Sequence, residues 1–116
     1  MVRTLQPKPE NDRDLERLIA AMGSRELEVA SAAVQQLHSL PAWTDGALVG
    51  RTFVAANLAG GHLVGANLAG SNFEGANLRW ADLARAQLQD SNLQVAQLAG
   101  AHLRWARLEK AQLKGA

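Results

Sequence analysis

Leucine or phenylalanine recurs at every fifth position along the C-terminal three fifths of the chain. The register holds without a slip through 14 positions: Leu48, Phe53, Leu58, Leu63, Leu68, Phe73, Leu78, Leu83, Leu88, Leu93, Leu98, Leu103, Leu108 and Leu113. The residue two places earlier is small in 13 of these 14 repeats, and Arg51 is the exception. The remaining positions hold mainly Asn, Asp, Gln, Arg, Lys and Gly. This pattern predicts a repeated five-residue unit.

A spacing of five residues fits neither an α-helix nor a flat β-strand. Five residues turn a helix to about 140° from the starting direction, so successive leucines would spread around its surface. In a strand the side chains alternate between faces, so leucines five apart would point to opposite sides. A solenoid can bury them, because a corner after every short side resets the direction of the chain. We therefore predict that the Leu/Phe position and the small position point inward.

A short motif, Ala-(Asn/Asp)-Leu, recurs within this register at residues 56–58, 66–68, 76–78 and 81–83. With it, residues 46–115 resemble the pentapeptide-repeat family. The resemblance implies a mainly β fold, a right-handed quadrilateral β-helix with four repeats per coil, so that 14 repeats make about 3.5 coils. Later repeats depart from the motif, since other side chains replace Asn/Asp at Gln87, Gln97, Arg107 and Gln112.

The segment before the repeats predicts a helical hairpin over residues 12–43, after a flexible lead-in at residues 1–11. Apolar residues with helical spacing mark the first helix: Leu15, Leu18, Ile19 and Met22. Gly23 is expected to end that helix and Ser24 to cap a second one, which runs to about Ser39 before Pro41.

This helix pair resembles a single HEAT-type unit. The end of a solenoid exposes apolar side chains and unpaired main-chain groups, so we expect the pair to cap the first coil. The alternative is an independent partner-binding module.

Composition and charge narrow the possible functions. One domain is expected, and the lack of cysteine excludes disulfides and thiol catalysis. Residues 1–20 carry no apolar leader or membrane span, and we expect a cytoplasmic protein. Residues 1–45 hold five Lys/Arg and seven Asp/Glu, net −2, whereas residues 46–116 hold seven and four, net +3. Several members of the resembled family act on DNA gyrase by imitating DNA with an acidic surface. The basic solenoid disfavours this topoisomerase-modulator alternative.

No constellation of residues indicates an enzyme or a cofactor. With 20-residue coils, His62, Asp82 and His102 form one outward column, and such side chains can bind zinc. Parallel side chains on a flat ladder do not converge tetrahedrally, so a solvated polar ladder is the favoured interpretation and no metal is expected. The regularly spaced glycines suit corners that need permissive φ angles rather than a phosphate loop.

The remaining candidates indicate a non-enzymatic scaffold or protein-interaction module. Trp80 and Trp105 occupy outward positions, and Arg85 is placed one coil from Trp105, within reach of a cation–π contact. The full set of predicted interaction residues is Trp80, Trp105, Arg79, Arg85, Arg104, Arg107 and Leu113. Leu113 belongs to a last coil that we expect to be open. It would be covered by a second copy, giving a homodimer, or by further repeats of a longer array. Neither nucleic acid nor membrane is an expected partner.

Overall fold

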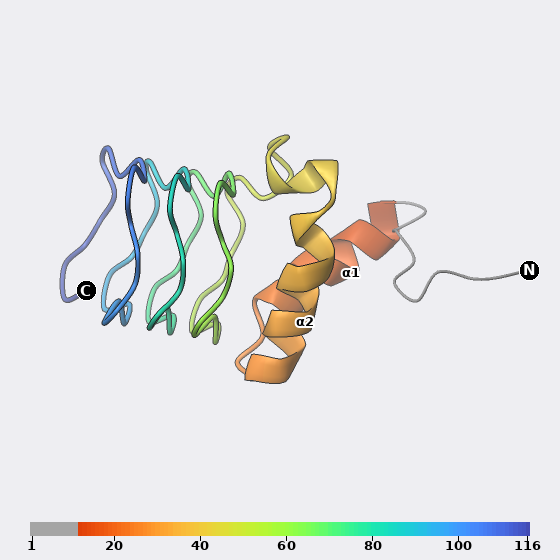
Figure 1. The fold of residues 1–116 in the computed structure, drawn as a ribbon, viewed down its shortest axis with the longest axis horizontal. Coiled ribbons are helices and arrows are strands. Elements are labelled where there is room, and N and C mark those ends of the chain that lie inside the picture. The colour runs from red at the N-terminus through yellow and green to blue at the C-terminus, as the bar shows by residue number, and fades with distance from the viewer. Residues whose placement is uncertain (1–11) are drawn as a thin grey trace, which may run out of the picture.

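The chain forms a helical hairpin followed by a solenoid (Figure 1). The computed structural model describes residues 12–116, so the lead-in expected for residues 1–11 lies outside the described residues. Helix α1 spans Asp12–Met22, helix α2 spans Leu27–His38, and a short 3-10 helix, η1, spans Pro41–Trp43. The predicted helix pair is therefore confirmed, and it stands at one end of the solenoid.

The second helix begins later than the sequence predicted. The Ser24 hydroxyl accepts a hydrogen bond from the Glu26 N–H at 3.0 Å, and the first helical residue is Leu27. A serine that bonds the amide two residues further on closes a local turn, which competes with helix capping. The prediction that Ser24 caps α2 was therefore wrong. The buried face of α2 consists of Ala30, Ala33, Val34 and Leu37.

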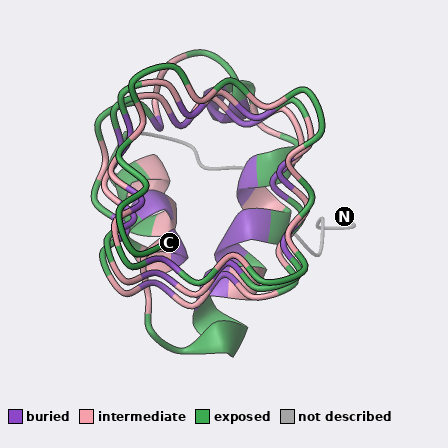
Figure 2. Ribbon diagram, turned by 90° about the vertical axis from the view of Figure 1, so that its left-hand side faces the viewer, coloured by how far each residue is buried: buried purple, intermediate pink, exposed green. Residues whose placement is uncertain are grey.

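Main-chain pairing links residues that are 20 positions apart, which is four repeats. Parallel bridges join, for example, His62 with Asp82 and Asp82 with His102. The Leu63 N–H donates to the Asp82 carbonyl at 2.8 Å, and the Asp82 N–H donates to the Gly61 carbonyl at 2.8 Å. Each side contributes one bridge rather than a long strand, because a corner interrupts the chain after every few residues. Seen along the axis, the coils stack as a four-sided tube (Figure 2).

The corners place the fifth residue of the repeats at positive φ. At the corner after Phe53, the Ala56 N–H donates to the Phe53 carbonyl at 3.0 Å, closing a β-turn. Glycine occupies this position in several repeats, as at Gly60, where φ is +66°. Trp80 and Trp105 adopt the same conformation, with φ of +59° and +60°. A left-handed residue other than glycine costs about 1–2 kcal/mol, so these corners carry large side chains at an energetic expense.

The Asn/Asp position of the motif has a structural role at these corners. The Asn72 side-chain oxygen accepts the Glu74 N–H at 3.0 Å, and the Asp82 carboxylate accepts the Ala84 N–H at 3.1 Å. An Asn or Asp that bonds the amide two residues later stabilises a turn, and the longer glutamine suits this geometry less well. The N–H groups of four further residues donate the same bond to the asparagine two places earlier: Ala59, Ala69, Arg79 and Gln94.

The core consists of stacked inward columns. Phe53 and Phe73, one coil apart, stack with ring centroids 5.1 Å apart and planes inclined by 27°. Leu93 is only 1% exposed, whereas Leu113, in the same column of the last coil, is 45% exposed. Figure 2 shows this last coil from its open end, where inward residues that are buried in earlier coils lose their cover.

The helices cap the first coil through polar bonds as well as apolar packing. The Asn57 N–H donates to the Ser24 carbonyl at 2.8 Å, and the Asn67 N–H donates to the Trp43 carbonyl at 3.0 Å. Later coils satisfy the equivalent amides with carbonyls of the preceding coil, as for the Asn77 N–H. The cap thus supplies acceptors that a further coil would otherwise provide.

An ion pair fixes α1 to the start of the solenoid. The Arg51 guanidinium donates two parallel hydrogen bonds to the Glu16 carboxylate, at 2.6 and 2.7 Å. Its Nε also donates to the Ala47 carbonyl at 2.8 Å. The hydrogen bond from Arg51 lowers the pKa of Glu16, and the same contact raises the pKa of Arg51. Arg51 breaks the small-residue rule because this position faces the cap.

Candidate protein-interaction surfaces

Trp105 is held on the solenoid surface by two arginines. The Arg85 guanidinium carbon lies 4.8 Å from the centroid of the Trp105 ring, so the predicted cation–π contact is confirmed. Arg104 approaches the same ring at 5.3 Å. Trp105 nevertheless remains 66% exposed. The arginines restrict the indole without covering it, which leaves a preorganised aromatic surface.

Trp80 lies over a glycine of the next coil. Gly100 follows it by 20 residues, and a Cβ built on Gly100 would come within 2.7 Å of the Trp80 Nε1 atom. Trp80 thus covers the glycine, yet it is still 67% exposed. This exposure leaves the indole available for a partner.

The two tryptophans flank one side of the solenoid. This side, here called the Leu63 side, comprises residues 61–63, 81–83 and 101–103. Trp80 occupies the corner just before residues 81–83, and Trp105 occupies the corner just after residues 101–103. A shallow hollow of about 560 Å³ adjoins Trp105 on this side and is lined by Val64, Asp82, Ala84, Arg85, His102, Leu103, Arg104 and Trp105. The structure therefore groups Trp105, Arg85 and Arg104 around one concave surface.

The other predicted residues lie on different parts of the molecule. Arg79 precedes Trp80 in its corner, beside the neighbouring side. Arg107 lies beyond Trp105 and pairs with Glu109 at 3.7 Å, with both side chains more than 60% exposed. Leu113 belongs to the last coil. The seven residues thus form no single patch.

The histidine column shows no metal-binding arrangement. His62, Asp82 and His102 are consecutive bridge partners, as the 20-residue register predicts. Within residues 12–116, no group of three or more His, Cys, Asp or Glu side chains is placed to hold a metal ion. The column contributes polar groups to the Leu63 side.

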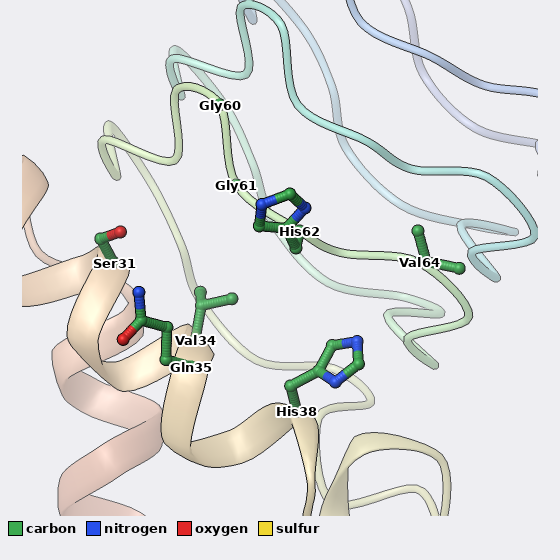
Figure 3. A pocket seen from close by; sticks show the side chains of 8 residues that line it. All are labelled: Ser31, Val34, Gln35, His38, Gly60, Gly61, His62 and Val64. Atoms are coloured by element: carbon green, nitrogen blue, oxygen red, sulfur yellow. The ribbon is translucent and has the colours of Figure 1, made fainter.

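A second cavity, which no pattern in the sequence indicated, lies between α2 and the first coil. It has a volume of about 400 Å³ and is lined by Ser31, Val34, Gln35, His38, Gly60, Gly61, His62 and Val64 (Figure 3). Figure 3 shows the α2 side chains facing the segment that carries His62. The four residues from α2 follow helical spacing, which places them on one face of the helix but does not predict the position of that face beside His62. The cavity arises where a straight helix meets a flat side.

A ladder with a 20-residue period and corners every five residues defines a β-solenoid built from short repeats. Residues 53–86 and 86–116 match the family model for pentapeptide repeats, in eight copies. The match covers more than half of the 116 residues, and the chain belongs to the pentapeptide-repeat family. Proteins of this family form right-handed β-helices and are generally structural or interaction modules.

Solved structures similar to this chain are themselves pentapeptide repeat proteins. Rfr23 from the cyanobacterium Cyanothece 51142 is 38% identical, with a TM-score of 0.52, over 53% of this chain and 42% of its own. The protein alr5209 from Nostoc PCC 7120 is 34% identical, with a TM-score of 0.29, over 53% and 67% of the two chains. HetL from Nostoc sp. strain PCC 7120, involved in heterocyst differentiation regulation, is 28% identical over 56% and 37%, with a TM-score of 0.28.

The chain therefore spans less than half the length of Rfr23. No curated protein matches it. Among the described residues, no helix has the length and apolar character needed to cross a membrane.

Proposed function

We propose that this chain is a non-enzymatic protein-interaction module, a short rod of about 3.5 coils if all 14 repeats count toward the solenoid. The observation that carries the proposal is the pair of exposed tryptophans that flank the Leu63 side. Tryptophan and arginine are enriched among residues that dominate binding energy. Arg85 and Arg104 already restrict the Trp105 side chain, so this side chain would lose little conformational entropy when a partner binds.

A comparison of single variants tests this surface. Trp105→Ala should leave the free energy of unfolding nearly unchanged, because the side chain is 66% exposed. It should weaken binding to a protein partner, isolated by affinity capture, by at least 2 kcal/mol, or about 30-fold. Val54→Ala is the matched control, since Val54 is an exposed apolar residue (41%) in the first coil. Equal binding by wild type and Trp105→Ala would reject this surface.

We also propose that the module self-associates through its last coil. Leu113 is 45% exposed, while Leu93 above it is 1% exposed, so the last coil exposes part of an inward leucine column. Two such ends that meet about a two-fold axis would bury their leucines in a homodimer. The alternative cover, further repeats of a longer array, would use the same coil surface.

Light scattering over a concentration series tests self-association. The wild-type protein should shift from monomer to dimer as its concentration rises, and the Leu113→Asp variant should remain monomeric. Val54→Asp, an equally charged change at the other end of the solenoid, should leave the dimer intact. A wild-type monomer at millimolar concentration would contradict the proposal.

The topoisomerase-modulator alternative receives no support from the surface charge. Arg85, Arg104 and Arg107 lie on the solenoid, whose net charge is +3, and a DNA mimic needs a strongly negative surface. We expect no effect in a gyrase supercoiling assay. Inhibition or protection of gyrase would instead favour that alternative.

A further inference from the structure

The main chain of His62 is left open by the cap. On each side of the solenoid, the residue before the inward Leu/Phe directs both its N–H and its C=O toward the preceding coil. Asp82, for example, donates to the Gly61 carbonyl and accepts from the Leu63 N–H. His62 holds the same position in the first coil, where α2 stands in place of a preceding coil. Within residues 12–116, neither its N–H nor its C=O has a hydrogen-bond partner.

The cap serves two of the other three sides of the first coil better, whereas within residues 12–116 the main chain of Thr52, on the Phe53 side, is as unpaired as that of His62. On two sides, carbonyls of Ser24 and Trp43 accept the equivalent amides, those of Asn57 and Asn67. On the Leu63 side, the cap reaches only the following corner, where the Trp43 indole N–H donates to the Val64 carbonyl at 2.9 Å. An exposed donor and acceptor on one extended residue form a short strand edge, which is a template for a further extended chain.

The cavity of about 400 Å³ lies against this edge (Figure 3). Val34 and Val64 give it apolar walls, while Gln35 and His38 place polar groups at its border. Side chains of an extended segment alternate between its two faces. If the residue paired with His62 points outward, the side chains directly before and after it therefore point toward the interior of the solenoid. The walls therefore match a segment that flanks its pairing residue with apolar side chains.

We propose that an extended segment of a partner protein binds here, parallel to the Leu63 side, and adds one bridge at His62. Its residue before the bridge accepts the His62 N–H, and its residue after the bridge donates to the His62 carbonyl. A single bridge per side is also how the coils of this solenoid pair with one another. This site is centred on His62 rather than on Trp105 or the last coil, although Val64 borders both hollows. The proposal does not depend on the function proposed above.

The position of α1 favours a partner over the chain's own first residues. Glu16 of α1 binds Arg51, which lies at the Phe53 side, opposite the Leu63 side. In Figure 1 the start of α1 lies at the end of the described chain that is farthest from the solenoid. A segment from residues 1–11 would have to return along the molecule to reach His62.

The test uses a peptide probe that reproduces one solenoid side. Acetyl-Gly-Ala-Asn-Leu-Ala-Gly-amide, copied from residues 65–70, would place its asparagine opposite His62 and its alanine and leucine toward the cavity. In titrations of the full chain followed by amide NMR, we expect saturable shifts at Gly61, His62, Val64 and Gln35. One or two hydrogen bonds and little apolar area correspond to a Kd of about 1 mM.

Matched controls distinguish binding at this site from nonspecific binding of the peptide. N-methylation of the peptide leucine removes the donor to the His62 carbonyl and should weaken binding roughly fivefold. Gln35→Trp fills the cavity from an exposed position of α2 and should abolish the shifts, whereas Ala32→Trp, exposed on the same helix but outside the cavity, should not.

Three results would overturn the proposal. The first is a lack of saturable shifts up to 10 mM peptide, about ten times the expected Kd. The second is a set of shifts centred away from His62, for example on the last coil. The third is a change of the His62 amide signal when residues 1–11 are deleted without peptide, because the chain's own lead-in would then occupy the site.

Discussion

Trp80 lies so close over Gly100 that the glycine has no room for a side chain. A Cβ there would meet the indole ring, although the two residues are 20 positions apart in the sequence. The contact links two coils on the outside of the solenoid, away from the leucine columns. It explains why this corner keeps glycine when other late corners hold larger residues such as Asp90 and Lys110.

Replacing Gly100 should therefore cost more than replacing a glycine with the same backbone. Gly60→Ala meets no atom within 4 Å but has a φ of +66°, so we expect a loss of about 1 kcal/mol. Gly100→Ala, with a φ of +73° and the indole above it, should lose about 1 kcal/mol more. Urea denaturation measures both. Adding Trp80→Ala should remove the excess loss, and equal losses for the two glycine variants would contradict the contact.

The leucine columns should lose stability unequally along the solenoid. Leu93→Ala removes a side chain that is 1% exposed and should cost about 2–5 kcal/mol. Leu113→Ala, in the same column at 45% exposure, should cost about 1 kcal/mol at low protein concentration. Thermal denaturation at two protein concentrations makes the comparison. If a second copy covers the last coil, the cost at Leu113 should rise with concentration; similar costs for both residues would contradict the open end.

Proline should distinguish an open edge from a paired one. His62→Pro removes an N–H that has no partner within the described chain, so we expect a loss below about 1 kcal/mol. His102→Pro removes the donor to the Ala81 carbonyl and should cost about 2 kcal/mol. The positions are equivalent in the repeat, so any strain from the fixed φ is shared. Comparable losses in denaturant titrations would mean that the His62 amide is engaged in the folded protein.

The ion pair between Glu16 and Arg51 should make stability depend on pH. The folded state lowers the pKa of Glu16, because Arg51 bonds its charged form. The stabilisation is therefore present above the usual glutamate pKa, near 4.5, and is lost as the pH falls through the lower, folded-state pKa. Glu16→Gln should destabilise the protein at pH 7 and have less effect at pH 2–3.

The control for this pair is Glu28→Gln, which changes a glutamate of α2 that makes no ion pair within residues 12–116. It should show no comparable dependence on pH. Because the Glu16 carboxylate is exposed, added salt should reduce the effect of its replacement. A Glu16→Gln effect that is the same at both pH values would exclude the pair as its cause.

The inward half of this structure was predictable, because it follows from period and size. A leucine every fifth residue with a small residue two places before it predicts a solenoid, and Phe53 above Phe73 follows from the four repeats per coil that the family resemblance implies. The Arg85–Trp105 contact was also predictable, since both positions are fixed by the same register. These predictions needed no knowledge of how separate elements meet.

The start of α2 and the cavity beside it were not predictable in the same way. The Ser24 hydroxyl had two amide partners available, and the turn that it formed moved the helix start to Leu27. Whether α2 leaves His62 open depends on the angle at which a helix crosses a flat coil end. No repeat sets that angle, because the cap reaches the coil through a few separate hydrogen bonds, at Ser24, Trp43 and Glu16.

The 20-residue coil has a consequence for how such a protein can change. An outward residue has fixed neighbours, 5 positions away across a corner and 20 positions away on the next coil. The sequence position of a residue therefore sets its place on the surface of the solenoid. Substitutions at outward positions can create or remove a binding surface for a partner while the leucine columns stay constant. Sequence identity between two such solenoids is therefore expected mainly at the inward positions, and a shared fold says little about a shared partner.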